Sequence, residues 1–217
     1  MIYPTTPGQP ESEHPDMDTD LAILHDTTEE LAAYLSEVTL AELRRLVEPH
    51  GRPLGALTLD LMHDHVRTAA TVSDAGMQPS EPGVPATTAE LEASLNPDGT
   101  GVESAYRRVG RRLEHAFAEG QARTGREPGS AQALHLARHH GHAVAGIVLH
   151  TWDVAQTLRL PYQPTTPVAW VVLRALTSTD REHGPDGANA DPAPGPGSAV
   201  LDGEAFRSAL QLTGRAA

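Results

Sequence analysis

The spacing of hydrophobic residues along the chain predicts helices, because no stretch keeps the strict alternation typical of a β-strand. A first helix is expected from Asp18, where apolar residues recur at intervals of three, four and seven. These residues form one stripe and are Leu21, Leu24, Leu31, Leu35 and Val38. Thr39 followed by Glu42 has the pattern of a capping box, which predicts a short helix through Leu46.

A second long helix is expected over residues 58–72, after a break at Gly51, Pro53 and Gly55. With about 100° of rotation per residue, one face holds Leu61, Met62, His65, Thr68, Ala69 and Val72. His65 is therefore expected to point to the core, whereas His63 is expected to point to solvent.

Two more long helices are expected over residues 102–119 and 130–158, after a proline-rich stretch with at most a short helix near 88–95. The third long helix has an apolar stripe and an arginine-rich face that is expected to be solvated. The fourth is apolar nearly all round between Ala143 and Val154, which is typical of a helix buried among others.

These elements predict an all-α protein, an antiparallel four-helix bundle with a long crossover and a short C-terminal helical appendage. The expected division is a flexible lead (1–17), the bundle (18–160) and a C-terminal helical extension (161–217). Within that extension, helices are expected over 168–176 and 203–212, on either side of a flexible loop rich in Gly, Pro and Asp at 179–199.

Composition and charge limit the classes of partner and of chemistry that are expected for the chain. The 217 residues carry a formal charge of −13, from 29 acidic residues and 16 arginines with no lysine. Nucleic acids and anionic membranes require a cationic surface, so neither is an expected partner. The absence of cysteine excludes disulfides, thiolate metal sites and a cysteine nucleophile. With no recognisable signal peptide or membrane span, a cytoplasmic location is expected. Oligomeric state is not readable, although a homodimer is compatible with the chain.

Histidines are the candidate chemical groups, twelve in all. On the fourth expected helix, His135, His139, His142 and His150 fall within one arc of roughly 80°. His139 and His150 are about 16 Å apart along the helix axis, so one metal ion cannot use both. A partly exposed polar start of the helix explains the HLARHHGH stretch equally simply.

His65 and His150 differ from that group because each lies mid-helix on a core-facing stripe. A buried imidazole needs a hydrogen-bond partner or a ligand. Two inward histidines from two helices are what a metal site inside a bundle requires. Two core histidines that are satisfied by other side chains would give the same pattern.

The stretch VLHTWDVAQTLRLP at 148–161 resembles a helix signature of the DinB-like superfamily, specifically the actinobacterial mycothiol-dependent maleylpyruvate isomerase family. There a His and one further residue precede Trp-Asp-Leu-Ala. Residues 56–69 resemble that family's second-helix motif, with His65 at the metal position. Residues 205–217 are similar to its C-terminal helix, which ends in Thr-Gly-Arg.

The resemblance implies a divalent metal, usually zinc, held by His65, His150 and a Glu four residues before His150. That position is Gly146 here. Three explanations are open: Asp153 substitutes as a ligand; the metal is lost and the histidines act as acid–base or plain polar groups; or Gly146, with Leu61 nearby, makes room in a pocket for a substrate.

The function that the resemblance implies is a metal- and mycothiol-dependent isomerase or S-transferase acting on a small activated alkene or electrophile. One alternative is a metal-free enzyme or small-molecule-binding protein of specialised metabolism that uses a pocket in the bundle. Another is a non-enzymatic regulatory or stress-associated protein that keeps only the fold. A small-molecule substrate is the expected partner in the first two cases.

Overall fold

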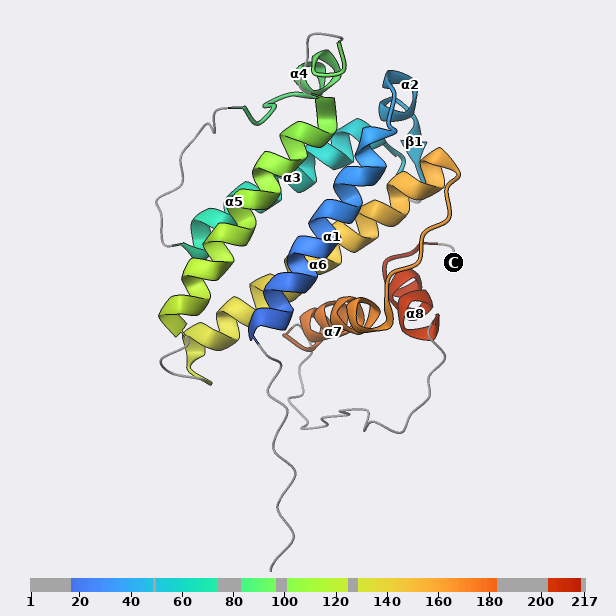
Figure 1. Ribbon diagram of the computed structural model, residues 1–217. Coiled ribbons are helices and arrows are strands. Elements are labelled where there is room, and N and C mark those ends of the chain that lie inside the picture. Colours follow the sequence, from blue (N-terminus) through green and yellow to red (C-terminus); the bar gives the residue numbers. More distant parts are fainter. Residues whose placement is uncertain are drawn as a thin grey trace, which may run out of the picture.

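A computed structural model describes residues 17–48, 50–73, 83–96, 101–124, 129–182 and 203–215. This part of the chain is mostly helical, with eight helices and one two-stranded sheet (Figure 1). The predicted all-α class is therefore confirmed. Residues 1–16 of the expected lead and 183–199 of the expected loop lie outside the described residues.

Four long helices carry most of the apolar stripes. They are α1 (Met17–Ser36), α3 (Leu54–Val72), α5 (Gly101–Thr124) and α6 (Ala131–Leu158). The other helices are α2 (Leu40–Leu43), α4 (Thr88–Ala93), α7 (Thr166–Glu182) and α8 (Glu204–Leu212). Two short antiparallel strands, β1 (Leu46–Val47) and β2 (Arg52–Pro53), lie between α2 and α3.

The segment between the first two long helices differs from the prediction. The short helix ends at Leu43, and Leu46 pairs with Pro53 in the small sheet, because Gly51 takes a φ of +60° and turns the chain back. Helix α3 then begins at Leu54 and includes Gly55 in its first turn. A Cβ on Gly55 would lie 3.2 Å from the carbonyl oxygen of Leu43, so this glycine permits close packing and does not break the helix.

Two other helices extend beyond their predicted ends. Helix α5 continues to Thr124, whose hydroxyl donates to the carbonyl of Gly120 in the last turn. Helix α7 runs to Glu182 and so includes the first residues of the expected loop. Helix α6 matches the prediction, and the Ser130 side chain caps it by accepting a hydrogen bond from the amide of Ala133.

The long helices pack against one another around a shared core. Helices α1 and α3 each contact both α5 and α6, while α7 packs on α6 and α8 on α7 (Figure 1). The largest fully buried apolar side chains come from all four long helices and include Leu31, Met62, Tyr106, Phe117 and Ile147. Helix α6 therefore lies at the centre of the contacts, and α7 and α8 cover one side of it.

The contact between α1 and α5 gives a first testable prediction. A Cβ at Gly110 would overlap the Cγ2 atom of Thr28, whereas a Cβ at Gly141 would meet only the Cβ of Ala175, at 3.5 Å. Gly110→Ala should lower the free energy of unfolding by about 1–3 kcal/mol through overpacking. Gly141→Ala should be neutral or raise it by up to about 1 kcal/mol through helix propensity. Urea unfolding of both variants measures this; equal effects would contradict the close approach.

Candidate functional site

His65 is the least satisfied polar side chain in the core. It projects from α3, is 1% exposed, and neither ring nitrogen has a hydrogen-bond partner. Burial lowers its pKa to about 4, although the negative charge of Asp64 opposes this effect. The imidazole is therefore neutral at pH 7. A buried polar atom without a partner costs about 1–3 kcal/mol, so this arrangement needs a reason beyond packing.

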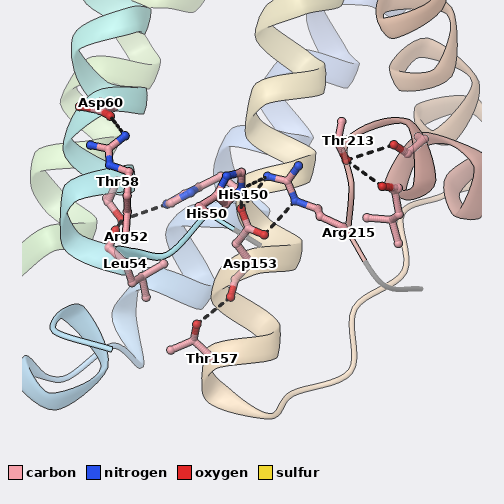
Figure 2. Close-up of polar contacts among 12 residues, drawn as sticks. His50, Arg52, Leu54, Thr58, Asp60, His150, Asp153, Thr157, Thr213 and Arg215 are labelled. Atoms are coloured by element: carbon pink, nitrogen blue, oxygen red, sulfur yellow. Dashed lines mark hydrogen bonds and ion pairs between the residues drawn. The ribbon is translucent and has the colours of Figure 1, made fainter. Parts of the chain in front are cut away.

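His150, on α6, has a partner that determines its tautomer. The hydroxyl of Thr58 donates its single hydrogen to the carbonyl oxygen of Leu54, at 2.9 Å. Nε2 of His150 lies 2.9 Å from the same hydroxyl, which accepts from Nε2–H when its own hydrogen goes to Leu54. In that arrangement Nε2 carries the ring hydrogen and Nδ1 keeps its lone pair; Figure 2 shows the contact between Thr58 and His150.

Burial also lowers the pKa of His150 to about 4, while the charge of Asp153 opposes this shift and those of Arg215 and His50 add to it. A positive charge on His150 would itself lower the pKa of His65, so the two rings are within electrostatic reach of each other. The structure thus places two neutral imidazoles, from the adjoining helices α3 and α6, in the same dry interior.

Two further buried hydroxyls accompany His65. The ring of Tyr106, on α5, is tilted at 46° to the His65 ring with centroids 6.0 Å apart. Thr28, on α1, is close enough to Tyr106 to affect the pKa of the phenol, which burial raises, but neither hydroxyl makes a hydrogen bond of acceptable geometry. We name His65, Tyr106 and Thr28 the inner polar cluster. Sequence analysis missed Thr28, which lies between Leu24 and Leu31 at the spacing of the apolar stripe.

Asp153 is engaged elsewhere. Its two carboxylate oxygens accept hydrogen bonds from Nε and an Nη of Arg215, at 2.9 and 2.8 Å. The same Nη donates to Nε2 of His50, at 2.9 Å. Figure 2 shows Arg215 reaching from the C-terminal segment to α6, with His50 beside the pair. The Asp153 side chain is 2% exposed and that of Arg215 8%, so this is a buried ion pair.

Gly146 and Leu61, the predicted pocket residues, do lie against each other. A Cβ on Gly146 would be 3.4 Å from Cδ1 of Leu61, so the Leu61 side chain occupies the space beside the glycine. Two shallow surface hollows of the described part of the chain lie elsewhere, one beside Tyr34 and Pro161 and the other between α1 and α5 near His25. His63, predicted to face solvent, is half-buried, with Nε2 3.0 Å from the carbonyl oxygen of Pro85.

The residues fit a divalent metal in part. His65 and His150 are neutral and desolvated, and each has a ring nitrogen that no hydrogen bond is known to use. No group of three or more His, Asp or Glu side chains that could surround an ion occurs among the described residues. The carboxylate of Asp153, the predicted substitute ligand, is paired with Arg215 in this structure. A metal here would have two protein ligands, one fewer than catalytic zinc usually has.

Comparisons with known proteins add no relative. No protein family, curated protein or solved structure matches the chain. None of the described helices is both long and apolar enough to cross a membrane. The interpretation of the site therefore depends on its own chemistry and on the motifs in the sequence.

The two buried histidines predict a pH dependence of stability. Because the folded-state pKa of each is depressed from 6.5 to about 4, their contribution is complete above pH 6.5 and is lost as the pH falls toward 4. Each of the two histidines should therefore lower the free energy of unfolding of the metal-free protein by about 3 kcal/mol at pH 4, compared with pH 7. Urea unfolding between pH 7 and 4 should show a smaller loss for His65→Leu than for the wild type. The exposed variant His115→Ala should keep the wild-type dependence, and a His65→Leu curve parallel to wild type would contradict the assignment.

The Arg215–Asp153 pair gives a second prediction. Arg215→Met leaves a buried carboxylate without its partner and should lower the free energy of unfolding by about 3–5 kcal/mol. Arg67→Met removes an ion pair with Asp64 in which both side chains are more than half exposed, and should cost less than about 1 kcal/mol. Chemical denaturation at pH 7 compares the two; similar small losses would mean that Arg215 does not hold the C-terminal segment.

Proposed function

We propose that α1, α3, α5 and α6 form a DinB-like antiparallel four-helix bundle with the long crossover between α3 and α5. The contacts of α1 and α3 with both α5 and α6 support this arrangement. So does the position of the two motif histidines, which lie on α3 and α6 and are both turned inward. Helices α7 and α8 would then be the C-terminal appendage.

The function that this site supports best is that of a maleylpyruvate isomerase-like enzyme, an isomerase or S-transferase that uses a low-molecular-weight thiol such as mycothiol on a small electrophile. The observation that carries the proposal is His65, which is fully buried with both ring nitrogens unpaired, within electrostatic reach of a second neutral imidazole. A core histidine with only a packing role would be expected to have hydrogen-bond partners for its ring nitrogens, because a buried polar atom without one is costly. The chain has no cysteine, so the sulfur would come from the thiol cofactor.

His65 and His150 are the residues that would hold a divalent metal such as zinc. The bound ion would supply a positive charge that lowers the pKa of the thiol and so delivers thiolate at neutral pH. The protein's own contribution is positional. With Thr58 accepting from Nε2–H of His150, Nδ1 would be left as the ligand atom, the same orienting role that outer hydrogen bonds play at other metal-binding histidines.

A second candidate follows from the engagement of Asp153 with Arg215 and from Gly146, which leave two protein ligands only. In this case the chain is a metal-free enzyme or small-molecule-binding protein. The lone pair on Nδ1 of His150 and a nitrogen of His65 would then exchange protons with a bound molecule. With a pKa of about 4, each imidazole is available as a base and is a poor acid at pH 7.

Metal content distinguishes the two candidates. Untagged protein reconstituted with zinc and analysed by mass spectrometry should hold one equivalent more than the His65→Ala, His150→Ala double variant. Thr58→Val should weaken the affinity for that one equivalent of zinc by about 10- to 100-fold, because it removes the hydrogen bond that orients His150. The matched control is Thr71→Val, which removes an exposed hydroxyl of the same helix.

The same proteins should then be mixed with mycothiol and maleylpyruvate. Turnover by the wild type that is lost in the double variant supports the thiol enzyme. Equal zinc in wild type and double variant, even after reconstitution, would contradict the metal site. Retention of a small molecule by such metal-free protein would support the second candidate.

A further inference from the structure

A second group of histidines lies near the amino-terminal end of α6, away from the buried pair. The rings of His135 and His139 are in contact, with centroids 4.3 Å apart and planes at 74°. They are one helical turn apart, at i and i+4, so both project from the same face of the helix. His139 is about 16 Å along the axis from His150, which makes this a separate location.

The neighbouring charged and aromatic groups show which rings are available. His140 is already engaged: its Nε2 lies 2.8 Å from the carbonyl oxygen of Asp20, and its ring packs edge-on against Phe117. His135 and His142 are exposed, and His139 is half-buried. Partial burial, followed by the charges of His135, His142 and Arg138, lowers the pKa of His139, whereas Asp64 on α3 opposes the shift.

Imidazole nitrogens that share one zinc ion each lie about 2 Å from it, so two rings that are in contact on one helix face can chelate one ion. The carboxylate of Asp64 favours a cation at this position, and so does the net charge of −13 over the whole chain. Arg138 acts in the opposite direction. The half-buried ring of His139 loses less side-chain entropy on binding than a fully mobile one would.

We propose that His135 and His139 form a divalent transition-metal site on the surface of α6, which binds ions such as zinc or nickel with water completing the coordination. The site consists of two protein ligands, in keeping with the lack of any three-residue group in the described part of the chain. It does not depend on the proposed function, because it shares no residue with His65 and His150. A bound ion would link two successive turns of α6 and stabilise the helix end where the chain enters it.

The test is a nickel titration of the untagged full chain by calorimetry at pH 7.5, in the His65→Ala, His150→Ala background. One equivalent of nickel should bind. Replacing either ligand, His135→Ala or His139→Ala, should weaken binding about 100-fold, because the second imidazole acts at a high effective concentration. The matched control is His115→Ala, an exposed histidine on α5 that faces Glu119 at i+4, and it should leave the affinity unchanged.

Two results would overturn the proposal. One is a nickel affinity that His139→Ala leaves unchanged. The other is a loss of affinity in His142→Ala as large as that in His135→Ala, which would show that His135 and His139 are not the ligand pair. If the background variant does not fold, the same question is answered with the isotopically labelled wild type. Paramagnetic nickel should then broaden the amide signals of residues 131–143 before those around His65 and His150. Broadening that begins around the buried pair would contradict the surface site.

Discussion

The exclusion of water from the centre of α6 is the constraint on which the rest of the structure depends. Any polar side chain on the buried turns of this helix must find a partner inside the fold, because an unpaired polar group or charge there is costly. His150 finds the hydroxyl of Thr58 on α3, and Asp153 finds the guanidinium of Arg215. Each contact ties α6 to a segment that is distant in the chain. The ion pair also reaches His50, next to the small sheet, so one buried carboxylate joins α6, the β1–β2 turn and the C-terminal segment (Figure 2).

Two residues on one turn of α6 therefore have different roles. His150 faces α3 and the interior, whereas Asp153, three residues later, holds the end of the chain. His65 stands apart from both because neither ring nitrogen has a partner, and the hydroxyls of Tyr106, whose ring lies near His65, and of Thr28, next to Tyr106, make no hydrogen bond of acceptable geometry either. Unpaired polar groups in a native core usually mark a place where a water molecule, an ion or a ligand belongs. The unpaired groups of the inner polar cluster thus lower the stability of the fold, and this cost is the physical reason to expect a functional role for the cluster.

Periodicity was sufficient to predict that His65 and His150 are buried, because the face of a helix on which a residue lies depends only on local spacing. It could not predict their partners. Thr58 and His150 are 92 residues apart, and Arg215 and Asp153 are 62 apart, so these contacts depend on how the helices rotate and dock. For the same reason the apolar stripe of the third long helix could be predicted, whereas the unpaired hydroxyl of Tyr106 on that stripe could not. Asp153 shows the same limit: its position one turn from His150 could be read from the spacing, but the pairing of its carboxylate with Arg215 could not.

In the proposed enzyme, Gly146 stands where the family that the motifs resemble has a Glu, and this changes the charge balance of the buried pair. Two neutral imidazoles cancel none of the charge of a divalent ion, and an uncompensated dication in a dry interior carries a large desolvation cost. Arg215 adds to this cost, since it lowers the pKa of His150 and hence disfavours positive charge at that ring, and only Asp153 acts in the other direction. In the proposed enzyme, an anionic ligand such as a thiolate would supply the negative charge that Gly146 does not. The same reasoning couples metal and thiol in the proposed enzyme, because each would lower the cost of binding the other; in the alternative, the two imidazoles remain neutral and serve a metal-free protein.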